Sequence, residues 1–90
     1  MRRSKASIIY EVLSVMVRNG GEASTSQISL EANLAYDRMM RLLEELEEKG
    51  LVAIRENRGR KLVVITDKGR ELYKHLAYVR RILSDFGISI

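Results

Sequence analysis

Apolar residues in the first part of the chain recur at the three-to-four-residue period of an α-helix. Between Ser4 and Arg18 they form a single stripe, so this segment is predicted to be an amphipathic helix packed on a core. The Ser4 hydroxyl can cap its start by accepting a hydrogen bond from a free backbone N–H. Asn19-Gly20-Gly21 is predicted to end the helix.

Two further helices are predicted, and a tight turn separates them. Residues 24–27 read Ser-Thr-Ser-Gln, a capping box that predicts a short helix to about Glu31. Ala32-Asn33-Leu34 predicts the turn, because Asn tolerates unusual backbone angles. The segment 35–49 predicts the third helix, ended by Gly50. Ala35 stands where a hydroxyl cap is expected, and Asn33 is the alternative cap. The predicted buried face consists of Met39, Leu42, Leu43 and Leu46.

After Gly50 the pattern changes from helical to strand-like. Residues 51–54 and 62–65 are short runs rich in β-branched side chains, which predict two strands. The connection 55–61 is polar and has Gly59 near its tip, so the pair is predicted to form a hairpin. This hairpin is basic, since it carries Arg55, Arg58, Arg60 and Lys61.

A last helix is predicted to begin at Thr66, a good N-cap, and to end at Gly87. Its apolar residues recur at alternating steps of four and three, a heptad seam shorter than an established coiled coil requires. The expected fold class is therefore mainly α with a small β-hairpin (α+β). Residues 1–69 are expected to form the main domain, and 70–90 a C-terminal helix that packs on the same domain and extends beyond it.

Composition narrows the possible functions. Ninety residues suffice for one modest core, and 46% hydrophobic with 31% charged residues is typical of a globular domain. The absence of Cys excludes disulfides and thiolate metal sites, and no cofactor is expected. No apolar run is long enough to span a membrane, and the basic N-terminus lacks a signal-peptide cleavage site, so a cytoplasmic protein is expected. The net charge of +4 favours an anionic partner.

The order of predicted elements is that of a winged helix-turn-helix, in which the helix after the turn enters the DNA major groove and the hairpin reaches the backbone or the minor groove. The acidic cluster 44–48 lies in the second half of the third helix, away from the end that would enter the groove. Arg pairs bidentately with guanine or phosphate, and Tyr can donate to phosphate. The predicted double-stranded DNA contacts are Tyr36, Asp37, Arg38 and Arg41 on the third helix, Arg55, Arg58, Arg60 and Lys61 on the hairpin, and an N-terminal arm of Arg2, Arg3 and Lys5.

The chain also resembles a known family. Residues 32–34, Tyr36, 42–51 and 65–69 are similar, in this order and spacing, to winged-helix transcription regulators, especially small archaeal ones. The opening Arg-Arg-Ser-Lys with Ile8-Ile9 looks like the archaeal chromatin-type winged-helix proteins, whose members dimerise through a C-terminal antiparallel coiled coil. The departures are Ala35, where relatives often carry Ser, and a shorter final helix. The resemblance implies a DNA-binding transcription regulator.

A homodimer is expected because the apolar stripe of the last helix extends farther than a domain of this size needs. Both parallel and antiparallel arrangements of the two helices stay open at this point. The predicted interface consists of Leu76, Val79, Leu83 and Phe86.

Two alternatives to a sequence-specific regulator stay open. One is a chromatin-like architectural protein of low specificity, because few side chains on the third helix can read bases. The other is a protein-interaction module, which the acidic half of that helix favours and the basic hairpin disfavours. An enzyme is not expected, since the single His75 has no catalytic partners and no glycine loop cradles a phosphate. No site for a small-molecule effector is evident.

Overall fold

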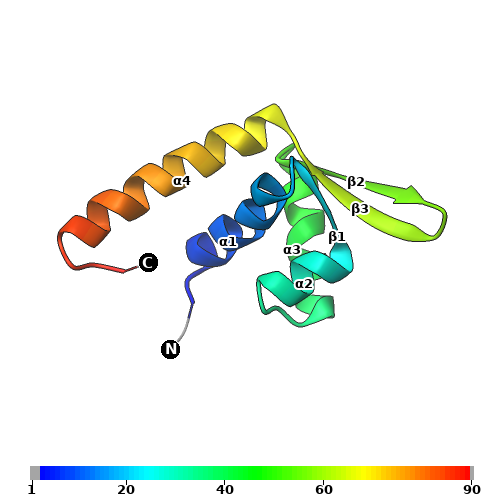
Figure 1. The fold of residues 1–90 in the computed structure, drawn as a ribbon, viewed down its shortest axis with the longest axis horizontal. Coiled ribbons are helices and arrows are strands. Elements are labelled where there is room, and N and C mark those ends of the chain that lie inside the picture. Colours follow the sequence, from blue (N-terminus) through cyan, green and yellow to red (C-terminus); the bar gives the residue numbers. More distant parts are fainter. Residues whose placement is uncertain (1–2, 90) are drawn as a thin grey trace.

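A computed structural model of the chain describes residues 3–89, so the predicted contact of Arg2 lies outside the described residues. The described chain folds into four helices and three strands (Figure 1), which confirms the mainly α prediction. In chain order the elements are α1 (Lys5–Arg18), β1 (Glu22–Ser24), α2 (Thr25–Glu31), α3 (Tyr36–Glu48), β2 (Val52–Asn57), β3 (Arg60–Ile65) and α4 (Asp67–Asp85). None of these helices has the length and apolar character needed to cross a membrane.

Local capping explains where three of the helices begin. The hydroxyls of Ser4, Ser24 and Thr66 accept hydrogen bonds from backbone N–H groups in the first turns of α1, α2 and α4, as predicted. The capping box of α2 is only half formed, because the Gln27 amide donates to Asn19 and Glu31 instead of returning to the cap.

The start of α3 differs from the prediction. Ala35 occupies the N-cap position and no side chain caps the helix, so the expectation that Asn33 would do so is wrong. Asn33 instead adopts the left-handed conformation, with φ of 53°, that reverses the chain between α2 and α3. The predicted tight turn is therefore confirmed, with its polar residue used for backbone geometry.

The sheet contains one strand more than the sequence pattern predicts. Its order is β1-β3-β2, and both neighbours pair antiparallel with β3. The three residues of β1 show no strand periodicity of their own, and they become a strand because β3 pairs with them. The N–H of Ile65 extends this pairing by donating to the Gly21 carbonyl at 2.9 Å.

The hairpin is longer and its loop shorter than predicted. The β2–β3 ladder continues to the pair Asn57↔Arg60, so the strands include most of the segment expected to be a polar connection. Only Arg58 and Gly59 remain in the turn, with positive φ angles of 52° and 77°. Two consecutive left-handed residues are the geometry of the tight turn that matches strand twist. The hairpin is thus a twisted arm that extends from the domain (Figure 1).

The core lies between α1, the two helices that follow it and one face of the sheet. Its fully buried side chains include Leu13 and Met16 of α1, Ile28 of α2, Leu43 of α3 and Val63 of β3. Leu42, predicted to be core, is only partly buried because it lies at the edge of the packed face of α3.

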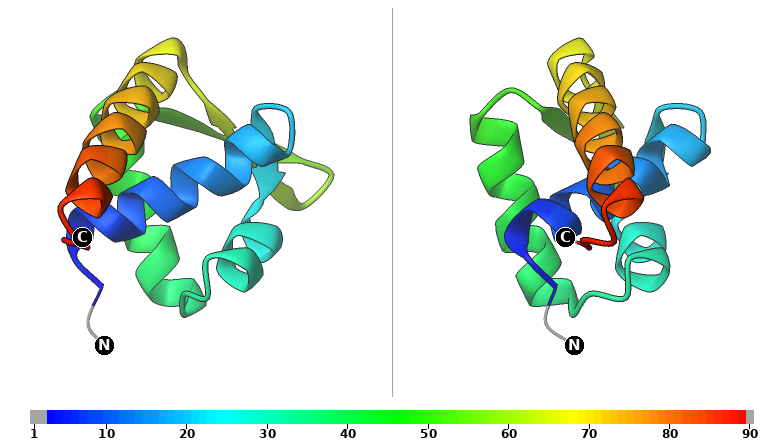
Figure 2. Two further views of the ribbon diagram at one scale, coloured as in Figure 1. Left: turned by 60° about the vertical axis from the view of Figure 1, so that its left-hand side comes forward. Right: turned by 90° about the vertical axis from the view of Figure 1, so that its left-hand side faces the viewer.

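The last helix packs on α1 with its first half and extends beyond it with its second (Figures 1 and 2). Tyr73 of α4 stacks on Tyr10 of α1 with 5.3 Å between ring centroids, and the Arg80 guanidinium lies 4.8 Å above the Tyr10 ring. Burial raises the pKa of Tyr10, but hydrogen bonding with Tyr73 and Arg80 outweighs it and leaves that pKa below its ordinary value.

Candidate nucleic-acid interface

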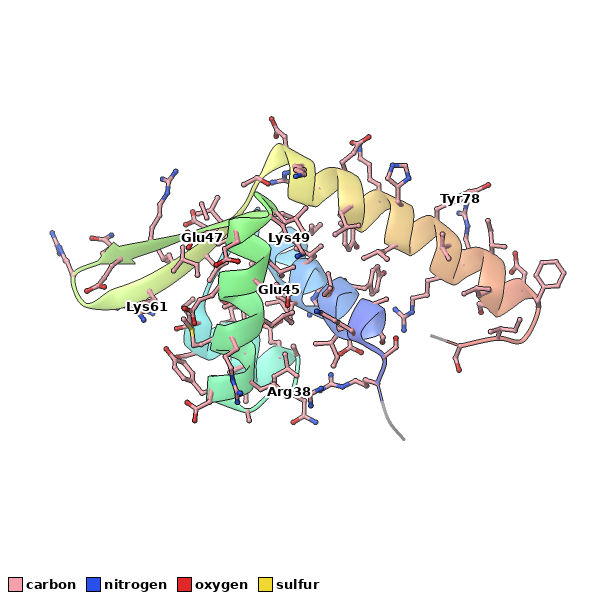
Figure 3. The ribbon with its side chains drawn as sticks, turned by 180° about the vertical axis from the view of Figure 1, so that it is seen from behind. Arg38, Glu45, Glu47, Lys49, Lys61 and Tyr78 are labelled. Atoms are coloured by element: carbon pink, nitrogen blue, oxygen red, sulfur yellow. The ribbon has the colours of Figure 1, made fainter. Side chains whose placement is uncertain are left out.

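The first half of α3 presents its polar side chains to solvent, as predicted. Arg38, Arg41 and Asp37 are exposed, and Tyr36 retains 46% of its surface. Figure 3 shows Arg38 near the end of α3 that lies farthest from the sheet, whereas Glu47 lies where α3 approaches β2. The basic half of α3 therefore lies at the end away from the sheet, and its acidic half lies beside β2. Met40, between Met39 and Arg41, is partly buried against the core.

The strand register divides the hairpin cations between two faces. Arg55 and Arg60 project from one face, because Arg55 pairs with Leu62 across the hairpin and Leu62 lies two residues from Arg60 on β3. Lys61 projects from the other face, which it shares with Val63 and which continues into the core. Arg58 occupies the turn itself. All four basic side chains are exposed, and no carboxylate within residues 3–89 forms an ion pair with them.

A polar depression of about 250 Å³ lies between the hairpin and the start of α3. The Tyr36 and Thr25 hydroxyl oxygens are 3.3 Å apart at its side, so one of these groups can still donate outward. Figure 3 shows Lys61 on the side of the hairpin toward the first turn of α3. Hydroxyl and cationic donors without a competing carboxylate suit the oxygens of a phosphate. The lining residues that the structure describes are Ser24, Thr25, Ser26, Tyr36, Gly59, Arg60 and Lys61.

Sequence reasoning missed the contribution of α2 to this depression. The sequence pattern assigns Thr25 and Ser26 only to a capping box, and the cap itself needs only Ser24. The signal that could have identified them is the run of three hydroxyl residues, two more than a cap requires. Their proximity to the hairpin, however, depends on how β1 and β3 pair.

The sequence from residue 2 to residue 84 matches a family model described as winged helix-turn-helix. The chain belongs to the winged helix-turn-helix family. In the vocabulary of that family, α2, the turn at Asn33 and α3 are the helix-turn-helix, and the β2–β3 hairpin is the wing. No curated protein is significantly similar to the chain in sequence.

Solved structures share this winged-helix fold. Sso10a-2, a DNA-binding protein from Sulfolobus solfataricus, aligns with a TM-score of 0.84 and 21% identity over 93% of this chain and 85% of that chain. F93 from STIV, a winged-helix DNA-binding protein, aligns with a TM-score of 0.78 and 18% identity over 86% of this chain and 90% of that chain. The fold is therefore that of small winged-helix proteins of the archaeal type, as the sequence resemblance implied.

Longer regulators contain a similar domain. Sco5413, a MarR family transcriptional regulator from Streptomyces coelicolor, aligns with a TM-score of 0.78 and 31% identity over 88% of this chain. That alignment covers 56% of the regulator, so the present chain spans little more than half of its length. It corresponds to the winged-helix part of such a protein.

The N-terminal cations are engaged within the winged-helix domain. The Arg3 guanidinium donates to the backbone carbonyls of Ala32 and Asn33 at 2.6 and 2.8 Å, and it also pairs with the Glu11 carboxylate. Lys5 pairs with Glu45 of α3 at 2.8 Å, and its hydrogen bond holds the pKa of that carboxyl below its usual value. These contacts tie the start of α1 to the turn and to α3, although the sequence suggested an arm reaching for DNA.

Two members of the acidic cluster have roles inside the domain. The Glu47 carboxylate accepts a hydrogen bond of 2.8 Å from the Ile54 N–H, a donor on the strand edge that β3 does not use. Glu45 is neutralised by Lys5. Glu44 and Glu48 are exposed. Within residues 3–89, no group of three or more His, Cys, Asp or Glu side chains is placed to hold a metal ion.

The predicted dimer-interface residues divide into two groups. Leu76 and Leu83 are half-buried, whereas Val79 and Phe86 expose 46% and 77% of their surface. Figure 3 shows Tyr78 on the same half of α4, directed away from the domain. The second half of α4 therefore carries an apolar stripe that nothing in the described chain covers.

Proposed function

We propose that this protein binds double-stranded DNA as a transcription regulator, acting by contact with the duplex and not by catalysis. In this proposal α3 enters the major groove through Tyr36, Asp37, Arg38 and Arg41, and the wing contacts the backbone or minor groove. The observation that carries the proposal is a hydroxyl-rich depression between Tyr36 of α3 and the wing cations Arg60 and Lys61, with no carboxylate among its described lining residues. The contacting wing residues are Arg55, Arg58, Arg60 and Lys61.

The relatives support the same function. Sso10a-2 and F93 are both described as DNA-binding proteins, and Sco5413 is described as a transcriptional regulator. The two acidic residues engaged within the domain, Glu45 and Glu47, also remove part of the argument for a protein-interaction module. A low-specificity architectural protein stays the second candidate, because only four polar side chains of α3 are available to read bases.

Titration of the full chain into a labelled random duplex, at several salt concentrations, tests the proposal. We expect affinity to fall steeply with salt, by about 0.9 log units per log unit of salt for each phosphate neutralised. Similar affinity for random and selected sequences would favour the architectural protein over the regulator. Absence of binding at low salt contradicts both and favours the protein-interaction module.

We further propose that α4 mediates a homodimer, with residues 1–69 as the DNA-binding domain and 70–90 as the dimerisation helix. Val79→Glu is expected to convert the dimer to a monomer, because it buries an unpaired carboxylate in the apolar stripe. The mass in solution, measured by sedimentation at several concentrations, reports the change, and we expect dimer affinity to fall at least about a hundredfold.

Ser84→Glu provides the matched control for this test, since it adds the same charge at an exposed position of α4 outside the predicted interface. If Ser84→Glu is also monomeric, the loss of the dimer in Val79→Glu is an effect of added charge in general and not of the apolar stripe. A wild-type protein that is monomeric at all concentrations contradicts the dimer proposal outright.

Arg3 is expected to influence DNA binding through the turn instead of through a phosphate contact. Arg3→Ala removes the donors to Ala32 and Asn33, and the orientation of α3 depends on that turn. We expect affinity for DNA to fall about tenfold, in line with the loss of charged hydrogen bonds, with an unchanged salt dependence.

Arg3→Lys distinguishes the two roles of this side chain. A lysine can preserve a phosphate contact, but it lacks the planar fork that reaches two carbonyls at once. If Arg3→Ala and Arg3→Lys lose DNA affinity to a similar extent, the positioning role is supported. A DNA-contacting arm is supported if Arg3→Lys binds DNA with wild-type affinity, and if the slope of log affinity against log salt is smaller by about one in Arg3→Ala.

A further inference from the structure

The outer part of the wing is not packed against the rest of the domain. Every residue from 55 to 61 is exposed, whereas Val52 and Val63, nearer the domain, are buried. The β2–β3 ladder holds the two strands to each other, but it does not fix the direction in which the pair leaves the domain. That direction depends on the contacts where the hairpin meets the domain. We call residues 55–61 the outer wing.

Two contacts hold the hairpin at the base of the outer wing, one on each edge. On the β3 edge, the pairing with β1 continues as far as Ser24↔Leu62. On the β2 edge no further strand pairs within the described chain, because β2 is the last strand of the order β1-β3-β2. The Glu47 carboxylate of α3 lies at this edge and accepts the Ile54 N–H at 2.8 Å (Figure 3).

The Glu47 contact differs from those that hold the connection between α3 and the sheet. The Thr66 hydroxyl donates to the Gly50 carbonyl at 2.7 Å, but Gly50 precedes β2. Within residues 3–89, the bond from Ile54 to Glu47 is the one hydrogen bond between α3 and β2 itself. It therefore links the helix that is proposed to enter the major groove directly to a strand of the wing.

We propose that Glu47 is a positioning residue, which fixes the direction of the wing relative to α3 so that both contact one duplex at the same time. This inference rests on the proposed function for its effect on DNA affinity. The distance between Arg38 of α3 and the cations of the outer wing is constant only if the hairpin leaves the domain in one direction. A wing that is already in place loses less conformational freedom when DNA binds, and this raises affinity.

The charge of Glu47 makes this role testable by the sign of an effect. A carboxylate close to a DNA-binding surface repels the phosphates, so its removal should raise affinity if charge alone matters. Loss of the link between α3 and β2 should lower affinity instead. A variant that removes the charge and keeps the hydrogen bond separates the two effects.

The test compares Glu47→Ala with Glu47→Gln. Both remove the same charge, but the amide oxygen of Gln can still accept the Ile54 N–H. We expect Glu47→Ala to bind a random duplex about fivefold more weakly than the wild type, which corresponds to the loss of one hydrogen bond of about 1 kcal/mol. Glu47→Gln should bind at least as tightly as the wild type.

The motion of the outer wing is the second measurement, and it uses the free protein. We expect NMR relaxation of the backbone amides of residues 55–61 to show larger fast motions in Glu47→Ala and wild-type motions in Glu47→Gln. The Tm should fall by only a few degrees in Glu47→Ala, because Glu47 is exposed and water can accept the freed N–H. A merely structural role would lower the Tm without mobilising the outer wing.

Glu48→Ala is the matched control for charge. It removes a carboxylate from the neighbouring exposed position, and no hydrogen bond joins Glu48 to β2 in the part of the chain that the structure describes. We expect its affinity for DNA to equal or exceed that of the wild type, with unchanged motion of the outer wing. Glu47→Asp keeps the charge but is shorter by one methylene, so it replaces Glu47→Ala if the alanine variant does not fold.

The outcomes separate this inference from the proposed function. If Glu47→Ala and Glu47→Gln change affinity in the same direction and the outer wing moves as in the wild type, the inference is overturned and the proposed function stands. If the wild type does not bind DNA, the proposed function fails, and the relaxation of the free variants alone decides whether Glu47 positions the wing. If Glu47→Ala self-associates and its outer wing stays ordered, Glu47 only protects the strand edge, and the inference fails.

Discussion

Replacing Arg38 and Arg41 together by alanine is expected to lower the affinity for duplex DNA about a hundredfold or more. Each arginine that pairs with a base or a phosphate contributes about 1–3 kcal/mol, and both side chains project from the half of α3 that is proposed to enter the groove. The fold should be unaffected, because both are exposed and neither holds a carboxylate within the described chain. Anisotropy titrations at several salt concentrations measure both the affinity and the number of phosphates contacted.

The salt dependence reveals what the two arginines bind. If both contact phosphates, the slope of log affinity against log salt falls by about two, whereas base contacts leave it nearly unchanged and relax sequence preference. The double variant Lys74→Ala/Arg81→Ala removes the same charge from exposed positions of α4 and should bind almost normally. If both double variants lose DNA affinity equally, the loss follows from net charge alone, which contradicts a specific role for α3.

Gly69→Ala is expected to destabilise the protein by about 3 kcal/mol, although helix propensity predicts the opposite sign. A Cβ at this position would lie 2.1 Å from the Leu51 carbonyl oxygen and 2.8 Å from a side-chain carbon of Ile65. The Leu51 carbonyl cannot withdraw freely, because it accepts the Thr66 N–H at 3.1 Å where α4 leaves the sheet. Glycine is therefore required here for close packing between helix and backbone.

Thermal unfolding followed by circular dichroism measures this effect. For a domain of this size, a loss of about 3 kcal/mol corresponds to a fall in Tm of about 15 °C. Glu71→Ala, an exposed substitution in the same part of α4, should change stability by less than about 0.5 kcal/mol. A Gly69→Ala variant as stable as Glu71→Ala would mean that α4 can move away from Leu51 at little cost.

Much of the fold could be predicted because its signals are local. The hydroxyl caps at Ser4, Ser24 and Thr66 act within one helical turn, and the positive φ of Asn33 is a property of that residue type. The change from helical to strand period after Gly50 is equally local. Their order along the chain was enough to predict a winged helix-turn-helix, and the family match confirms it.

The sequence predicted which residues of the candidate site are exposed, but not which groups each side chain contacts within the domain. Exposed Arg38 and Arg41 follow from helical periodicity, which assigns them to the face opposite Met39 and Leu43. The contacts of Arg3 could not be predicted, because Ala32 lies 29 residues farther along the chain. A terminal arginine has the same local signature whether it contacts a turn or a phosphate.

By itself, the sequence determined which segments are helical, where they begin and end, and which faces carry charge, because these depend on interactions between residues a few positions apart. Tertiary structure alone decided that residues 22–24 form a strand, that Arg3 supports the turn and that Gly69 must lack a side chain. It also decided that Leu42 is only partly buried, at the edge of the packed face of α3. Each of these features depends on the distance between atoms far apart in the sequence, and that distance is set only when α1, α3 and the sheet pack together.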